Sequence, residues 1–511
     1  MKSLLKLGLP LFLIALIVLP VLPGCAAVPP EPHSAAQEPV PDLVIIHTND
    51  MHSRAIYVEE REIGYALIAA EAEKLRQAGE RVLLLDAGDT FHGMAMASLH
   101  HGESIVAFMN IAGYEVMTPG NHDFNYGAGR LIELADMADF PLVAANVRND
   151  SGPLFPPFEV IDYGDLKVGI IGLVTTETYF KANPAGLTGI IFDDPIEAAR
   201  LATEELAGQD VDLIIALTHL GLDLDSDAVS SRQLAEAVEG IDLIVDGHSH
   251  QRLPEGVWVN KTLIVQTGCY SSDIGLVRIS FSNDGSKLLS ARLIDVVEAD
   301  SLDPEPLMTA AIERYNLLNE PVLQEIVSYS SVDLVGEREQ VRVEQTNLGD
   351  AIVSAMLLES GADVAIINGG SIRASIAAGP VTKGDLIAVL PFGNTTGLVE
   401  VTGAELVAML ENGLAAYPEP SGAFPHVGGL TYSFAAESEP GLRTSDWMVG
   451  TRPLDPEAHY RLVTTDFLLA GGDNYEMLKG KRVLFEYGTL DELLADYMAE
   501  QYLFEDSAGS E

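Results

Sequence analysis

The sequence is poor in cysteine and in basic residues, and it has no apolar run long enough for a comfortable transmembrane helix. Cys25 and Cys269 are the only cysteines in 511 residues, which excludes a disulfide scaffold and a thiolate-rich zinc site. Lysine and arginine number 29 against 76 aspartates and glutamates, giving a formal net charge of −47. Such a surface repels phosphate backbones and anionic lipids, so we expect no nucleic-acid duplex as a partner. A small phosphorylated substrate is still compatible with this composition, provided that cations in the binding site overcome the repulsion from the negative surface.

The first 24 residues have the organisation of a signal peptide, with two early lysines and an apolar stretch over 7–22 that prolines interrupt. Residues 22–25, Leu-Pro-Gly-Cys, resemble a bacterial lipobox, although proline is unusual at its second position. The resemblance implies cleavage before Cys25, a lipid on its sulfur and an extracytoplasmic protein anchored to the cell membrane. The alternative is an ordinary secretory signal and a periplasmic or secreted product. Residues 25–41 are rich in proline and predict an extended tether.

From residue 42 onward, short apolar runs alternate with amphipathic segments. The runs are rich in aliphatic and β-branched residues, which predicts buried strands at 43–48, 81–88, 141–146, 167–174, 211–219 and 241–248. Apolar residues at helical spacing predict helices at 62–78, 127–137, 195–207 and 230–238. This alternation indicates an α/β fold whose sheets are covered by helices. A hydrophobic content of 47% over 511 residues indicates a folded chain with at least two domains.

The character of the strands changes after about residue 270. An amphipathic strand is predicted at 274–282, and a helix at 306–320 follows a polar, proline-containing segment. A second domain is then predicted from helices at 346–359, 403–414 and 488–502 and from strands at 363–367, 397–402, 430–435 and 460–464. The predicted organisation is a signal peptide (1–24), a tether (25–41), a first domain (42–300), a linker helix (301–325), a second domain (326–505) and a tail (506–511).

Side chains that bind metals follow five of the apolar runs of the first domain. These residues are Asp50 and His52, Asp89, Asn121 to Asp123, His219, and His248 and His250. In open α/β sheets, the carboxyl ends of the strands form the edge where ligands bind. A single aspartate there is usually a helix cap and a lone histidine usually has a structural role, but five such strand ends together indicate a site. Carboxylate, amide and imidazole ligands suit Zn, Mn, Fe or Co, and their number suits two ions that share a carboxylate.

The ordered motifs DxH, GD, GNHD, TH and GHSH resemble those of the calcineurin-like metallophosphoesterases, and GHSH together with the second domain resembles the 5'-nucleotidase branch. The resemblance covers roughly residues 42–505. It implies an N-terminal metallophosphoesterase β-sandwich flanked by helices, joined by a helix to a smaller α+β C-terminal substrate-recognition domain. The activity it implies is hydrolysis of a phosphoric ester by a water that two divalent metal ions activate.

The resemblance also assigns roles to particular residues. Asp50, His52 and His250 would bind one metal ion, Asn121, His219 and His248 would bind the other, and Asp89 would bridge the two. His248 and His250 can each reach one ion, because residues two apart in an extended segment point to the same side. His122 would contact the phosphoryl oxygen or the leaving group and supply a proton as that oxygen gains charge.

The second half of the chain carries four candidate substrate-binding residues, Arg373, Phe424, Phe467 and Asp473. Taken singly, a loop phenylalanine is usually packing and an arginine is usually a solvated surface group. Together the four resemble the nucleotide pocket of 5'-nucleotidases, in which two aromatic rings enclose the base, an arginine lies on the phosphate or sugar side and an aspartate contacts the ribose. Stacking tolerates different bases, so modest base selectivity is expected.

One position departs from the pattern of many 5'-nucleotidases, which have an acidic residue three positions after the GNH histidine. Here Asn125 occupies it, as in relatives that act on 2',3'-cyclic nucleotides. A carboxylate would favour a charged His122 more than an amide does. The expected function is therefore an extracytoplasmic nucleotide phosphohydrolase of 5'-nucleotidase type, with a 2',3'-cyclic-nucleotide 2'-phosphodiesterase/3'-nucleotidase or a UDP-sugar hydrolase as alternatives. A sulfur-ester hydrolase of the same fold and a binding lipoprotein without turnover are further alternatives, and the oligomeric state stays open.

Overall fold

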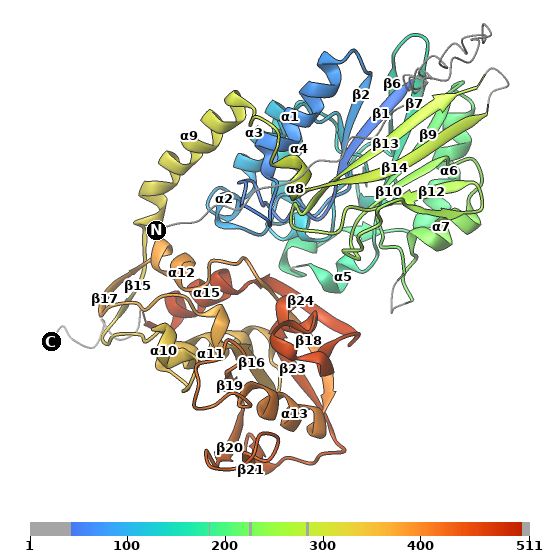
Figure 1. Cartoon of the computed structure of the whole chain (residues 1–511). Coiled ribbons are helices and arrows are strands. Elements are labelled where there is room, and N and C mark those ends of the chain that lie inside the picture. The colour runs from blue at the N-terminus through green and yellow to red at the C-terminus, as the bar shows by residue number, and fades with distance from the viewer. Residues whose placement is uncertain (1–41, 183, 224–226, 283–285, 503–511) are drawn as a thin grey trace, which may run out of the picture. The chain divides into compact units, whose positions relative to one another are not determined.

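The computed structural model describes residues 42–502 except 183, 224–226 and 283–285 (Figure 1). The predicted signal peptide, Cys25, the tether and the tail at 506–511 lie outside the described residues. Within the described ranges, no helix combines the length and the apolar character needed to cross a membrane.

Two sheets pack face to face in the N-terminal domain. The first has the order β14-β13-β1-β2-β3 and contains β1 (Leu43–Thr48), β2 (Val82–Asp86), β3 (Val116–Met117), β13 (Asp273–Phe281) and β14 (Lys287–Asp295). The second has the order β11-β12-β10-β9-β7-β6 and contains β6 (Phe158–Asp162), β7 (Lys167–Val174), β9 (Leu213–His219), β10 (Leu243–Asp246), β11 (Val257–Val259) and β12 (Thr262–Val265). Strands β1, β2 and β3 run parallel to one another, as do β7, β9, β10 and β12.

The alternation of side chains along β1 shows how this sandwich forms. Leu43 and Ile45 point into a core shared with Ile215 and Val245 of the second sheet. Their neighbours on β1 point the other way, into a core beneath α1 (Gly64–Gln77), α3 (Glu103–Ala112) and α4 (Ala128–Met137). Helices α6 (Pro195–Ala207) and α7 (Ser231–Ala237) cover the outer face of the second sheet. Because β1, β2, β7, β9 and β10 are buried on both faces, these strands read as continuous apolar runs.

The C-terminal domain follows the long helix α9 (Pro306–Leu323) and is built on a five-stranded sheet of order β19-β16-β23-β18-β24 (Figure 1). Its strands are β16 (Val364–Asn368), β18 (Thr395–Thr402), β19 (Pro425–Gly428), β23 (His459–Thr465) and β24 (Val483–Thr489). One face packs against α11 (Asn347–Ser360), α12 (Lys383–Val389) and α15 (Leu490–Tyr502), and the other against α13 (Gly403–Gly413). The remaining strands form smaller sheets, including β20-β21-β22 (Leu430–Phe434, Thr444–Val449 and Arg452–Pro453).

The predicted fold class is confirmed, and most predicted elements have counterparts within a few residues. The strand expected at 141–146 is wrong, because this segment makes only an isolated bridge between Leu142 and Met117 of β3, and its remaining hydrogen bonds do not continue a ladder. The N–H of Ala144 donates to Pro156 O, that of Ala145 donates to Gly172 O, and the side chain of Asn146 bonds both main-chain groups of Val174. Helix α3 and strand β24 were not anticipated from the sequence. The domain boundaries stay predictions.

Candidate metal centre

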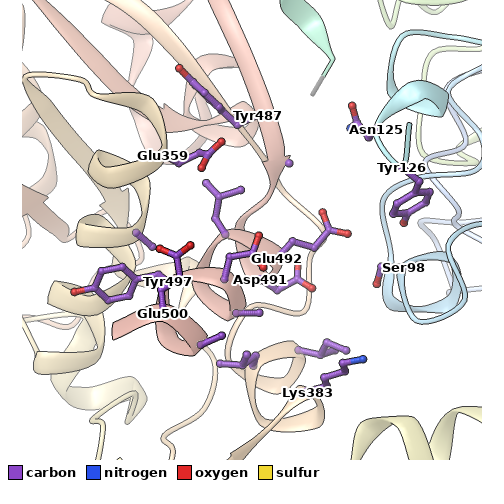
Figure 2. Close-up of a pocket in the computed structure, with 18 of the residues that line it drawn as sticks. Ser98, Asn125, Tyr126, Glu359, Lys383, Tyr487, Asp491, Glu492, Tyr497 and Glu500 are labelled. Carbon is purple, nitrogen blue, oxygen red and sulfur yellow. The ribbon is translucent and has the colours of Figure 1, made fainter. Parts of the chain in front are cut away.

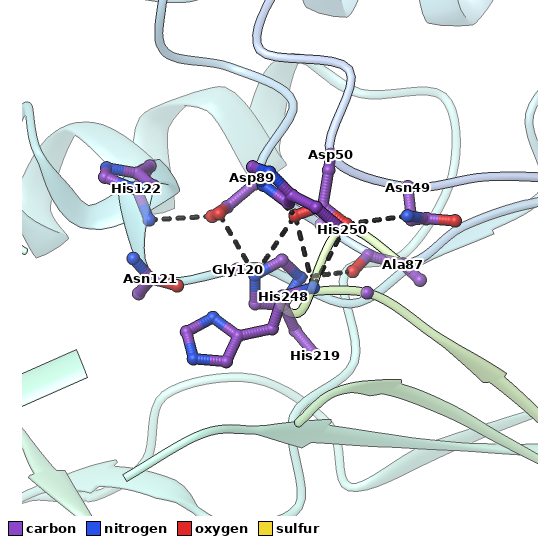
Figure 3. Close-up of polar contacts among 12 residues, drawn as sticks. Asn49, Asp50, Ala87, Asp89, Gly120, Asn121, His122, His219, His248 and His250 are labelled. Carbon is purple, nitrogen blue, oxygen red and sulfur yellow. Dashed lines mark hydrogen bonds and ion pairs between the residues drawn. The ribbon is translucent and has the colours of Figure 1, made fainter. Parts of the chain in front are cut away.

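The predicted ligands converge where β1, β2, β3, β9 and β10 end (Figure 3). Several occupy a left-handed backbone conformation that side chains rarely adopt: φ is +50° at Asp50, +43° at His52, +56° at Asp89, +75° at His248 and +53° at His250. Such conformations cost about 1–3 kcal/mol each and persist where surrounding contacts hold them. Their concentration at one edge of the sandwich marks a functional site.

The ligand atoms form two groups, Asp50 with His52 and His250, and Asp89 with His219 and His248, and the atoms of each group lie within 4.8 Å of one another. Asp89 lies between the two groups. Its Oδ2 is 3.1 Å from His219 Nε2 and 4.0 Å from His52 Nε2 (Figure 3). The structure thus brings these predicted ligands together in two groups with Asp89 between them, and their roles as metal ligands stay a prediction.

The chemistry of these residues fits a pair of divalent cations. Asn121 Oδ1 is buried and has no hydrogen-bond partner among the described residues, which is costly unless a cation is present. Nε2 of His52 and Nε2 of His250 lie only 3.4 Å apart, and two lone-pair donors facing one another are suited to a shared ion. Two buried carboxylates complete a donor set typical of Zn, Mn, Fe or Co.

Electrostatics at the centre also favour positive charge. Burial opposes ionisation of Asp89, but the imidazoles of His219, His122 and His52 outweigh it and hold the pKa of Asp89 well below its usual range. Burial likewise opposes charging of His219, yet Asp89 and Asp50 raise its pKa to about 10. The carboxylates therefore generate a field that stabilises cations at the position where metal ions would bind.

His122 begins the turn after β3 and contacts groups from distant parts of the chain. Asn125 Nδ2 lies 3.1 Å from His122 Nδ1 and 3.3 Å from His92 Nδ1, so the amide joins the two rings. On the other side of the ring, His122 Nε2 lies 3.2 Å from Glu486 Oε2 of β24. Burial opposes charging of His122, but Asp89 and Glu486 raise its pKa. Position 125, where many 5'-nucleotidases have an acidic residue beside this histidine, is an asparagine here. The carboxylate that contacts the His122 ring comes instead from Glu486.

Buried aspartates hold the loops that carry the ligands. Asp123 accepts hydrogen bonds of 2.7–2.9 Å from four main-chain N–H groups, those of Asp89, Thr90, Phe91 and Gly120. Asp246 accepts from Thr218 Oγ1 at 2.7 Å and from Ser231 Oγ at 2.8 Å, which joins the ends of β9 and β10. Charged acceptors form the stronger class of hydrogen bond, so these two side chains support the strained loops.

The four candidate substrate-binding residues come together in the C-terminal domain. Asp473 accepts from Asn368 Nδ2 at 2.7 Å, and the main-chain N–H of Gly369 donates to Phe424 O. Phe467 lies over Gly472, where a Cβ would collide with its ring. Phe467 is 41% exposed, whereas Phe424 is only 6% exposed, so the two rings offer very different areas for stacking.

A cluster of arginines adjoins these residues, although only Arg373 was anticipated from the sequence. The pKa of Arg342 is lowered by burial and by the neighbouring charges of Arg338 and Arg373, while Asp473 opposes the shift. The Nε of Arg342 is buried without a hydrogen-bond partner among the described residues. In a chain of net charge −47, these three guanidinium groups are a local concentration of positive charge.

A cavity of about 640 Å³ opens beside Asn125 and Tyr126 (Figure 2). Its opposite wall includes Lys383 and five carboxylates, those of Glu359, Asp491, Glu492, Asp496 and Glu500. The cavity holds none of the predicted metal ligands. Its negative lining is unsuited to a phosphate.

Comparison with known proteins agrees with this geometry. Residues 43–252 match the family model of the calcineurin-like phosphoesterases, and residues 326–480 match that of the 5'-nucleotidase C-terminal domain. A 5'-nucleotidase from Vibrio cholerae is 31% identical over 93% of this chain and 93% of its own length. The crystal structure of a 5'-nucleotidase precursor from Thermus thermophilus is 33% identical, covers 90% of this chain and 96% of that chain, and has a TM-score of 0.56.

A trifunctional nucleotide phosphoesterase of Bacillus subtilis is 31% identical over 85% of this chain, which spans only 32% of that longer protein. Fold, site and comparisons together define a metal-dependent phosphoester hydrolase with a metallophosphoesterase domain. More particularly, the chain belongs to the 5'-nucleotidase family.

Proposed function

We propose that this protein is an extracytoplasmic nucleotide phosphohydrolase that removes phosphate from nucleoside monophosphates. The observation that carries the proposal is the position of Asp89 between two groups of metal ligands, with His122 beside it. The nucleotide part rests on the C-terminal group of Phe467, Asp473 and neighbouring arginines.

Each residue of the centre has a defined task in this proposal. Asp50, His52 and His250 would hold one ion, Asn121, His219 and His248 would hold the other, and Asp89 would serve both. Divalent ions at these positions, when bound, polarise the phosphoryl oxygens and lower the pKa of the attacking water. His122, whose pKa is raised by Asp89 and Glu486 against the effect of burial, holds a proton that it donates to the leaving oxygen.

The C-terminal residues hold the nucleoside. The exposed ring of Phe467 stacks on the base, with Phe424 on its other side, and Asp473 accepts hydrogen bonds from the ribose hydroxyls. Arg373 and Arg342 supply positive charge on the phosphate side, which offsets the repulsion between a nucleotide and a chain of net charge −47.

A second candidate substrate class is the 2',3'-cyclic nucleotides, and the specific observation in its favour is Asn125. Its amide nitrogen is 3.1 Å from His122 Nδ1, where an acidic residue would stabilise the charged ring. The carboxylate that helps to raise the pKa of His122 comes from Glu486 instead, so position 125 stays neutral, as in relatives that act on cyclic nucleotides. UDP-sugars are a third class that the same centre would accept.

Attachment through a lipid on Cys25 is the remaining part of the proposal. It is supported by the lipobox-like residues 22–25 and by the proline-rich segment that follows them. The net charge of −47 makes an electrostatic attachment to an anionic bilayer unfavourable, so a covalent lipid is the attachment that the sequence supports.

Phosphate release from a panel of substrates tests the proposal most directly. The full chain, loaded with Mn²⁺ or Zn²⁺, would be assayed with nucleoside 5'-monophosphates, 2',3'-cyclic nucleotides, UDP-glucose and p-nitrophenyl phosphate. The proposal expects the highest kcat/KM with a nucleoside 5'-monophosphate and loss of activity on chelation. A preference for the cyclic substrates would select the second candidate, and activity on p-nitrophenyl phosphate alone would overturn the assignment of a nucleotide substrate.

A further inference from the structure

The three predicted ligands of the second metal ion share a structural feature. In each, the polar atom that points away from the centre is held by another part of the chain. His219 Nδ1 donates to Ala87 O at 2.7 Å, Asn121 Nδ2 donates to Lys181 O at 2.6 Å, and His248 Nε2 donates to Glu177 Oε2 at 2.6 Å. The remaining atoms, His219 Nε2, Asn121 Oδ1 and His248 Nδ1, are thereby left as the candidate metal donors.

Two of these three contacts come from one short segment that no sequence motif marked. Glu177 immediately precedes helix α5 (Thr178–Lys181), and Lys181 ends it. The side chains of Glu177 and His248 are each only 3% exposed, so their hydrogen bond is formed in a region of low dielectric. Lys181 Nζ lies 3.1 Å from the same oxygen of Glu177 and compensates the charge of this buried carboxylate.

We propose that the Glu177–Lys181 turn is a positioning element for the second metal site. Because a carboxylate can only accept, Glu177 places the proton of a neutral His248 on Nε2 and leaves the lone pair of Nδ1 for the metal. In the same way, the main-chain oxygen of Lys181 accepts a hydrogen bond from Asn121 Nδ2. This contact fixes the amide so that Oδ1 faces the centre. Carboxylates in this arrangement raise the basicity of a metal-binding imidazole and fix its orientation. The inference rests on the proposed dimetal centre.

The effect of removing Glu177 is therefore expected to be confined to one of the two ions. Loss of such a supporting carboxylate lowers metal affinity by about 10–100-fold. Glu177→Ala should weaken the second site by this factor, and Glu177→Gln should weaken it less, because its amide oxygen can still accept the proton of His248. Lys181→Met should also have the smaller effect, since the contact to Asn121 comes from the main chain. The site of Asp50, His52 and His250 should keep its affinity.

The experiment is a titration of the metal-free full chain with Mn²⁺, followed calorimetrically, for the wild type and these variants. His248→Ala and His52→Ala serve as references for loss of the second and of the first site. Glu197→Gln is the matched control, because Glu197 also pairs with a cation on a helix but is 58% exposed and distant in sequence from the ligands. The Glu177→Ala isotherm should resemble that of His248→Ala, while Glu197→Gln should match the wild type.

Equal weakening of both ions, or an unchanged isotherm, would overturn the proposal. If Glu177→Ala fails to fold, Glu177→Leu decides it, since leucine fills the space of the side chain but cannot accept the proton of His248: a selective loss at the second ion supports the inference and unchanged binding overturns it. A failure of the dimetal centre itself is distinguishable, because the wild-type chain would then bind fewer than two equivalents of Mn²⁺.

Discussion

Replacement of Phe467 by alanine separates substrate binding from folding more cleanly than any other change in the nucleotide pocket. The ring is 41% exposed and lies over Gly472, which has no side chain, so its removal leaves no core cavity. We expect the free energy of unfolding to change by no more than about 0.5 kcal/mol, as for other surface positions. Phe424 is only 6% exposed, and its replacement is expected to cost roughly 3–5 kcal/mol of stability as well as binding.

The magnitude of the binding effect follows from base stacking. One aromatic stack contributes about 1–3 kcal/mol, which corresponds to a rise in nucleotide KM of roughly 5- to 150-fold. Hydrolysis of p-nitrophenyl phosphate should change little, because this substrate has no base to place against Phe467. The measurements are kcat and KM for both substrates and the thermal unfolding temperature of the metal-loaded protein.

Phe434→Ala is a matched control for this experiment. Phe434 belongs to the same domain and is 38% exposed, but its ring packs edge-on against Tyr417 in the β20 region and is not among the predicted pocket residues. It should leave nucleotide KM unchanged. If Phe467→Ala impaired both substrates equally, the ring would have a structural role and the nucleotide pocket would have been assigned to the wrong residues.

Three further changes test other parts of the molecule. Asp89→Asn should weaken binding of at least one metal ion and remove most activity, and full metal occupancy with near-normal kcat would contradict a bridging role. Asn125→Asp adds a negative charge beside His122, which should raise the pKa of His122 further and move the alkaline limb of the kcat profile to higher pH, because the protonated ring is the active form. The same variant should favour 5'-monophosphates over cyclic substrates. Superimposable pH profiles would show that position 125 does not tune His122. Cys25→Ser should release the protein from the membrane fraction, and a variant that stays bound at high salt would refute lipid anchoring.

Features that are set by residues close together in the chain could be predicted from the sequence. Strands β1, β7, β9 and β10 were recognisable because burial on both faces makes each a continuous apolar run. The ligands that follow them were recognisable because motifs such as GNHD and GHSH place several donors within a few positions. Segment 141–146 shows the limit of this reasoning, since its apolar run is buried but makes only an isolated bridge to β3 and scattered hydrogen bonds to β7 and to Pro156, which only the folded chain brings near it.

The groups that hydrogen-bond to those candidate ligands could be identified only in the folded protein. Glu177 meets His248 across 71 positions of the chain, and Glu486 reaches His122 from the C-terminal sheet. Nothing near Glu177, Glu486 or Arg342 in the sequence distinguishes them from the many other charged residues. Their roles arise because the order of strands in the sheets brings distant segments together in a buried environment, where the energy of a charge depends on its surroundings and not on its neighbours in sequence.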